Sequence, residues 1–459
     1  MSQNNTRTST HQSPDKNAKR LQNQVFRGDY NLSRYNACVG DNGAPNIYYY
    51  AEGFSEAVFL LIDSVKNDSR LSIDTLIYPI CFNVRHSVEL YLKALWGELS
   101  KLAEAKKVSL QLPLFENKPV NVLNTHEIGI IWDGVASNAT HLDKRFSSVV
   151  EDLAPLIACI HEVDSTGQTF RYDYDMKTDT KHLVPVSLIN IINLKRQFET
   201  IVNKLEELKK LSRYLNYEYS MGTFTKKLNR ADIQNIAHRL PHRDRWKDGE
   251  LSKVKGILML EYGIGSREFS FAVKKIEELH DLSFNIGVEK EPLGLTKEDL
   301  LKFSDIWGVR NDINEWRDNL IAALDGSMMN GIGFEYDLSN VDDRINKMIL
   351  DMEKNDMAFN EFIKYATPDN VSGCIALYEY RGCSFSEEYV NLYNNHFEYY
   401  DDAYKEGGER WDAAIRNAWS NYFEYSVLLK HMILSLRNLN MPSSAYAIEK
   451  HCMVEGLIR

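Results

Sequence analysis

Cysteine is scarce in this sequence and badly spaced for cross-linking. The six cysteines lie far apart, and none forms a CxxC pair. Such spacing offers neither the close ligands of a thiolate zinc site nor the dense pairing of a disulfide-stapled secreted domain. Separated single cysteines are typical of reduced thiols, so we expect a cytoplasmic protein.

Long apolar runs are also missing. The best late candidate, residues 425–436, is short and is interrupted by Lys430 and His431, whereas a membrane-spanning helix needs roughly 18 apolar residues or more. Residues 1–24 are rich in Asn, Ser, Thr and Lys and lack the apolar segment of a secretory signal. We therefore expect no membrane span, and a disordered leader over residues 1–24.

Several catalytic motifs are absent. The sequence contains no GxxxxGK[ST] phosphate loop and no GxSxG nucleophile elbow. His126 and Glu127 match the first two residues of the HExxH motif of zinc proteases. The second histidine of that motif would fall at position 130, which is Ile130. These absences argue against P-loop nucleotide hydrolases, ordinary serine hydrolases and zinc proteases, and we expect neither a metal nor a cofactor.

The composition is that of a globular protein with more than one core. Of 459 residues, 44% are hydrophobic and 26% are charged, and a chain of this length exceeds what one core usually serves. Residues 1–250 carry 32 basic and 30 acidic side chains, whereas residues 251–459 carry 22 and 35. A polyanion would therefore favour the first half, and most of all residues 201–250.

Helical periodicity dominates the chain and predicts a mainly α fold. The clearest pattern covers residues 76–102, where Arg85, Glu89 and Lys93 share one face at i, i+4 steps. Further helices are predicted over 54–65, 146–161, 186–211, 232–240, 267–279, 297–324, 341–365, 387–404 and 410–438. Residues 110–123, with two prolines, are predicted to be a loop, and residues 372–380 are the best strand candidate.

These patterns divide the chain into three parts. We expect the leader over 1–24, a helical bundle over 25–215, and an acidic, aromatic-rich, mostly helical domain with a few short strands over 216–459. The aromatic side chains of the last two predicted helices recur at spacings of three and four. Core packing explains such a stripe, and a partner surface is the alternative.

Short motifs in the first domain resemble HEPN domains, the helical bundles named for higher eukaryotes and prokaryotes nucleotide binding. The segments are HSVELYLKAL at 86–95, NTHEIGIIWD at 124–133 and FRYDYD at 170–175. The matching residues are Glu89, Lys93, Ala94, Thr125, His126, Glu127, Arg171 and Tyr172. The resemblance covers roughly residues 50–212 and implies a helical bundle that engages RNA or nucleotides, often as a homodimer, in bacterial stress or phage defence.

The ribonuclease signature of that family is missing. Its catalytic members carry an Arg followed by a His with four to six residues between them, and none of the twelve histidines here has an Arg at that distance upstream. Arg85 and His86 are adjacent, so on a helix they diverge by about 100°. We interpret Arg85 as salt-bridged or solvated and His86 as capped or packed.

Residues 226–246, called here the basic stretch, lie within the most basic part of the chain, residues 201–250, and are the predicted nucleic-acid site. Candidate binding residues are Lys226, Lys227, Arg230, Arg243, Arg245 and Trp246, because grouped cations hold phosphates and an indole stacks on bases. Candidate catalytic residues for metal-independent RNA cleavage are Arg239, His242 and His238, which could supply a cation and a proton-transferring ring. The alternative is a solvated helix face that pairs with the acidic half of the chain.

Two other functions stay open. Asp369 and Glu379, near the predicted strand, could share a divalent metal in a nuclease-like site, although Arg381 stands where a Lys is usual. The chain could also be a non-catalytic module that binds another protein. The leading expectation is an HEPN-like protein that engages RNA or nucleotides, with a homodimer as the expected assembly.

Overall fold

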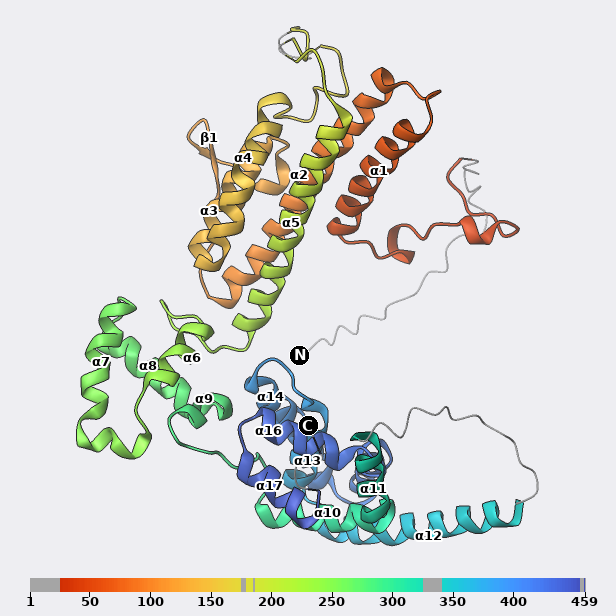
Figure 1. The fold of residues 1–459 in the computed structure, drawn as a ribbon, viewed down its shortest axis with the longest axis vertical. Helices are drawn as coiled ribbons and strands as arrows, with labels where there is room; N and C mark the ends of the chain where they lie inside the picture. Colours follow the sequence, from red (N-terminus) through yellow and green to blue (C-terminus); the bar gives the residue numbers. More distant parts are fainter. Residues whose placement is uncertain (1–24, 175–178, 185, 325–340, 455–457, 459) are drawn as a thin grey trace, which may run out of the picture. The chain divides into compact units, whose positions relative to one another are not determined.

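The computed structural model describes residues 25–174, 179–184, 186–324, 341–454 and 458. These residues are mainly α-helical, as the sequence predicts, with one two-stranded hairpin (Figure 1). The predicted leader lies outside the described residues. The described chain divides into two compact units: the first comprises the residues up to Leu99 and Leu110–Lys209, and the second comprises Ser100–Ser109 and the residues from Lys210 onward.

Five long helices build the first unit: α1 (Ile47–Asn67), α2 (Ile73–Ala105), α3 (Ile128–Leu142), α4 (Ser147–Val163) and α5 (Ile191–Ser220). Figure 1 shows α2 and α5 running side by side through this bundle. The apolar positions of each helix recur every three or four residues, so each helix buries one stripe in a common core. That core includes Val88, Leu92, Leu95, Ile131, Leu153, Phe198 and Leu205.

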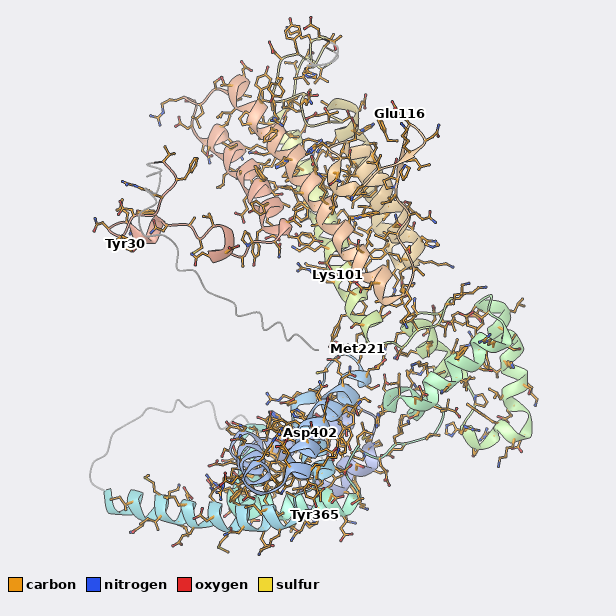
Figure 2. The ribbon with its side chains drawn as sticks, turned by 180° about the vertical axis from the view of Figure 1, so that it is seen from behind. Tyr30, Lys101, Glu116, Met221, Tyr365 and Asp402 are labelled. Atoms are coloured by element: carbon orange, nitrogen blue, oxygen red, sulfur yellow. The ribbon has the colours of Figure 1, made fainter. Side chains whose placement is uncertain are left out.

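The segment between α2 and α3 contains the only sheet of the described chain. Strands β1 (Leu114–Phe115) and β2 (Lys118–Pro119) pair antiparallel. Glu116, labelled in Figure 2, and Asn117 form the turn with positive φ of 49° and 63°, which suits the right-handed twist of a tight hairpin. The predicted loop over 110–123 thus contains a short hairpin.

Helix α5 extends past the expected domain boundary at residue 215. Its buried stripe continues from Leu205 and Leu208, in the first unit, to Leu215 and Tyr219, in the second. Because the hydrophobic repeat never breaks, the sequence gives no local sign of where one unit ends. The compact units divide between Lys209 and Lys210, inside the helix, which ends just before Met221 (Figure 2).

The second unit contains two hydrophobic cores. The first core is formed by α6 (Arg230–Arg239), α7 (Glu250–Glu261), α8 (Ser266–Glu278) and α9 (His280–Asn285). The second is formed by α10 (Lys297–Asn311), α11 (Ile313–Leu324), α12 (Val341–Tyr365), α13 (Pro368–Tyr380), α14 (Ser386–Glu406), α15 (Gly408–Ala418), α16 (Leu428–Asn438) and α17 (Pro442–His451). A π-helical turn, Trp419–Phe423, follows α15. Short 3-10 turns occupy Ser33–Tyr35, Gly40–Asn42, Val122–Asn124, Lys144–Phe146 and Arg243–Asp248.

The aromatic stripe near the end of the chain is mainly core, as predicted. Tyr389, Tyr400, Trp419 and Phe423 are buried in the second core of this unit. Other members of the stripe, such as Tyr404, are exposed. Packing therefore accounts for the spacing of the stripe without a base-stacking surface.

The strand predicted over 372–380 is wrong, because these residues belong to α13. Thr367 caps the helix, its hydroxyl accepting the backbone N–H of Asn370, and Pro368 occupies the first turn, where a missing N–H is harmless. Nearly every residue of α13 is buried. A helix buried on all sides has a continuous apolar run without period, which is indistinguishable from a buried strand. The second unit has no strand among its described residues.

Candidate functional site

Three nitrogen-bearing side chains converge on one carboxylate in the first unit. Glu89 of α2 is 4% exposed, and its Oε1 accepts hydrogen bonds from Lys93 Nζ and from His126 Nδ1, each at 2.8 Å. Its Oε2 accepts from Arg85 Nη1 at 3.1 Å. We call Arg85, Glu89, Lys93 and His126 the Glu89 cluster. It unites three residues of the family-like motifs, Glu89, Lys93 and His126, which lie on two different segments of the chain.

Arg85 fixes the position of the backbone around this cluster. It is 2% exposed, and besides Glu89 it donates to three carbonyl oxygens: those of His126, Asp164 and Ser165. These carbonyls belong to the segment before α3 and to the end of α4. The interpretation of Arg85 as a salt-bridged residue is confirmed, and its guanidinium ties α2 to the segment that carries His126.

The ionisation of Glu89 determines the tautomer of His126. Burial raises the pKa of Glu89, but the hydrogen bond from Lys93 and the charges of Arg85 and Lys93 outweigh it and lower that pKa below its ordinary value. An ionised carboxylate only accepts, so His126 Nδ1 must carry the shared proton. In the neutral ring Nε2 is then an acceptor. The His126 side chain is 72% exposed, and no described residue hydrogen-bonds to its Nε2.

Aromatic rings and one exposed arginine flank the cluster. The His86 ring packs edge-on against Phe54 at 4.5 Å and stacks on Phe82 at 5.4 Å, so the prediction of a packed His86 is confirmed. Burial lowers the pKa of His86, and although Glu89 opposes this, the charge of Arg85 adds to it. The guanidinium of Arg171 lies over Phe82 at 5.7 Å and over Tyr172 at 5.3 Å.

This face of the first unit suits an anion with a planar group. Arg171 is exposed and carries a charge that no described carboxylate neutralises, and Tyr172 is 44% exposed beside it. His126 presents an oriented imidazole close enough to influence the pKa of His86, which stacks on the same Phe82 that Arg171 covers. A carboxylate behind an imidazole is the arrangement that general acid–base chemistry needs.

The predicted basic site in the second unit has a different environment. Arg230, the first residue of α6, is 5% exposed, and it donates to both carboxylate oxygens of Glu387 and to Asp281. Burial opposes its charge, but those two carboxylates more than compensate and raise the pKa of Arg230 above its ordinary value. Its guanidinium is therefore already paired with carboxylates of the same chain.

Two other candidate arginines are also paired. Arg239 Nη1 donates to Glu261 at 2.7 and 2.8 Å, and Arg243 Nε donates to Glu277 at 2.7 Å while its guanidinium covers the Trp246 ring at 4.2 Å. The Trp246 Nε1–H donates to the Pro241 carbonyl. These pairs support the alternative that the basic stretch contacts acidic residues of the same chain.

The remaining candidates of this stretch are exposed. Lys227 Nζ donates to the Gly263 carbonyl, while no described residue pairs with the side chains of Lys226 and Arg245. His238 and His242 are exposed, and no hydrogen bond among the described residues joins either ring to Arg239. The structure thus directs Arg239 to Glu261 rather than to a histidine.

The two carboxylates of the metal-nuclease hypothesis do not meet. Asp369 and Glu379 lie on the same helix, α13, ten residues apart, which separates them by about 15 Å along the axis. Asp369 accepts from the Tyr393 hydroxyl, and Glu379 accepts from His396 and the Tyr422 hydroxyl. Within the described part of the chain, no three His, Cys, Asp or Glu side chains gather as metal ligands.

All four members of the Glu89 cluster stand out in the sequence, but the sequence alone does not show that they contact one another. The i, i+4 spacing of Arg85, Glu89 and Lys93 predicted that they share one helix face, and the structure shows that they form ion pairs there. The contact with His126 spans 37 residues and depends on the packing of α2 against the start of α3. The one available signal was that Glu89 and His126 belong to the same family-like pattern.

No family model, no curated protein and no solved structure matches this chain. Among the described residues, no helix combines the length and the apolarity needed to cross a membrane.

Proposed function

We propose that this protein engages RNA or nucleotides at the face of the first unit formed by the Glu89 cluster, Phe82, Arg171 and Tyr172. The observation that carries the proposal is the buried Glu89 carboxylate, which orients an exposed His126 ring. Burying the three charged groups Arg85, Glu89 and Lys93 together is costly unless each is well paired. Such clusters concentrate at functional sites, because they fix the protonation state of a reacting group.

The chemistry of the face fits a nucleotide. A phosphate is held by the exposed Arg171 guanidinium, which can offer two parallel N–H donors. The exposed Tyr172 ring beside it provides a surface for one base, and stacking of this kind contributes about 1–3 kcal/mol per base. RNA adds a 2′-hydroxyl: its proton passes to Nε2 of the neutral His126 ring, its oxygen attacks the adjacent phosphorus, and the bond from phosphorus to the 5′-oxygen breaks, the 5′-oxygen leaving with a proton from water. His126 therefore makes this a site for metal-independent cleavage.

The test is incubation of the full chain with mixed single-stranded RNA, with and without EDTA. We expect cleavage that EDTA leaves unchanged and that His126→Ala lowers by about a hundredfold or more, the usual contribution of a general base. His141→Ala is the matched control, because His141 is an exposed histidine on α3 of the same unit. Cleavage that needs a divalent ion, or that survives in His126→Ala, would contradict the assignment of His126.

A second candidate function, a non-catalytic protein-binding module, is favoured by the basic stretch. Three of its arginines, Arg230, Arg239 and Arg243, contact the protein's own carboxylates. Arginines that are paired with carboxylates in this way are less available to bind phosphates. If wild-type protein at low salt binds no RNA and no nucleotide, this second function replaces the first.

A further inference from the structure

A polar hollow of about 520 Å³ opens in the second unit, between α12, the end of α10 and the starts of α11 and α16. Its walls hold four basic side chains from three helices: Arg310 of α10, Lys347 and Lys354 of α12, and Lys430 of α16. We call it the lysine hollow. Sites for small molecules have volumes of about 300–1,000 Å³, so this space is large enough for a ligand of nucleotide size.

The protein's own acids do not pair with the three lysines of the hollow. Among the described residues, no carboxylate or carbonyl oxygen accepts a hydrogen bond from Lys347, Lys354 or Lys430. The described carboxylate contact of Arg310 is with Glu424 at 3.8 Å, which is longer than a hydrogen bond. The basic stretch is different, because three of its arginines contact carboxylates closely. Cations that the fold itself leaves unpaired favour an anionic ligand.

Three carboxylates, Asp312, Glu315 and Asp351, also line the hollow. Asp312 is engaged by the backbone, because its Oδ1 accepts the N–H groups of Asn314 and Glu315 at the start of α11. Four cations against three carboxylates leave a small net positive charge, from which an anion with a single charge gains little. Adjacent phosphates carry several negative charges and accept charge-assisted hydrogen bonds from several cations at once. The balance of charge therefore favours a multiply charged anion.

The spacing of the cations favours an extended anion. Lys347 and Lys354 lie seven residues apart on one face of α12, which separates them by about 10 Å along the helix axis. Arg310 and Lys430 approach from other walls of the hollow. A chain of phosphates contacts cations at such separations more readily than a single phosphate. We propose that the lysine hollow binds the polyphosphate group of a small molecule, either a nucleoside polyphosphate or free inorganic polyphosphate.

The lysine hollow and the face proposed to engage RNA belong to different units, so the two proposals fail separately. Inorganic tripolyphosphate has no base to stack on Tyr172 and no 2′-hydroxyl for His126. The double variant His126→Ala, Arg171→Ala should therefore bind tripolyphosphate with wild-type affinity. Loss of that binding in the double variant would place the anion in the first unit and overturn the proposal.

The experiment is isothermal titration of the full chain, at low salt and with EDTA, with four probes: ATP, inorganic tripolyphosphate, adenosine and hexaglutamate. We expect ATP and tripolyphosphate to bind, more weakly as salt rises, and adenosine and hexaglutamate not to bind. Tighter binding of ATP than of tripolyphosphate assigns the hollow to a nucleoside polyphosphate, and equal binding assigns it to the free anion. Failure of tripolyphosphate to bind overturns the proposal, and equal binding of hexaglutamate replaces it with a surface for an acidic peptide.

Variants locate the anion within the second unit. Lys354→Gln combined with Lys430→Gln should weaken tripolyphosphate binding by about tenfold or more, because two charge-assisted contacts are lost. Lys364→Gln is the matched control, since Lys364 is an exposed residue of α12 that does not line the hollow and that pairs with Glu361. Asp351→Asn should tighten binding, because it removes a negative charge from the wall. An equal loss in Lys364→Gln, or weaker binding in Asp351→Asn, contradicts the assignment.

Discussion

The Glu89 cluster and the basic stretch both combine cations with carboxylates, yet they differ in burial and in what they leave free. In the first unit, three buried charges hold one another and leave the His126 ring exposed. In the second unit, exposed arginines such as Arg239 and Arg243 are matched one to one with glutamates. A count of charges along the sequence favours the basic stretch as the anion-binding site, whereas the geometry of the side chains favours the Glu89 cluster.

The comparison teaches that a local excess of basic residues is a weak guide to an anion site. Exposed pairs are screened and contribute little. A buried network with one exposed, oriented member is structurally costly, and it fixes the orientation and tautomer of that member.

Removal of the central carboxylate, Glu89, should give the largest difference in stability between the two regions. Glu89→Gln leaves Arg85 and Lys93 buried without a counter-charge, so we expect a loss of about 3–5 kcal/mol in the free energy of unfolding. Glu261→Gln, its counterpart beside Arg239, should leave that free energy unchanged within error. Urea unfolding of both variants checks this, and equal effects would break the contrast.

Arg230 is the exception within the basic stretch, because it is buried between Glu387 and Asp281. Arg230→Leu should destabilise the protein by about 3 kcal/mol, since it leaves two carboxylates without their cation. Arg230→Lys should recover only part, because an ammonium cannot reproduce the two-pronged contact with Glu387. A stable Arg230→Leu protein would show that Arg230 is as dispensable as its exposed neighbours.

The two units should also differ in their response to acid. Burial, with the charge of Lys290 adding to it, lowers the pKa of His280 to about 4. Unfolded protein then binds more protons than folded protein between about pH 6.5 and pH 4, so stability falls as the pH drops through that window. From pH 7 to pH 5 the loss is roughly 2 kcal/mol.

Glu89 contributes no such loss between pH 7 and pH 5. Its lowered pKa contributes stability that is fully present above pH 4.5 and is lost only in more acidic solution. Thermal unfolding from pH 7 to pH 5 should therefore weaken the second unit first. His280→Phe, which keeps a ring against Tyr389, should remove that pH dependence, and a slope that persists would assign it to other groups.

Helices with a one-sided apolar stripe were predictable from the sequence, and the exceptions have physical causes. Helix α7 was missed because Leu258 is its one buried residue while Ile257 and Leu260 are exposed, so no stripe forms. Helix α13 was read as a strand for the opposite reason, since it is buried all round. Hydrophobic periodicity predicts only helices that bury one face and expose the other.

The candidate site was predictable in part. The i, i+4 spacing on α2 revealed Arg85, Glu89 and Lys93 as neighbours. The contact from His126, and the glutamates that engage Arg239 and Arg243 from 22 and 34 residues away, arise from tertiary packing. The spacing of residues along the chain does not predict such contacts.

The most direct test of the account is the affinity of a short single-stranded RNA for two matched double variants at low salt. One carries His126→Ala and Arg171→Ala, and the other carries Lys226→Ala and Arg245→Ala, the two exposed cations of the basic stretch without a described partner. We predict that the first loses about tenfold or more in affinity, equivalent to about 1.4 kcal/mol, and that the second matches wild type. The reverse result would place the site in the second unit and contradict the account.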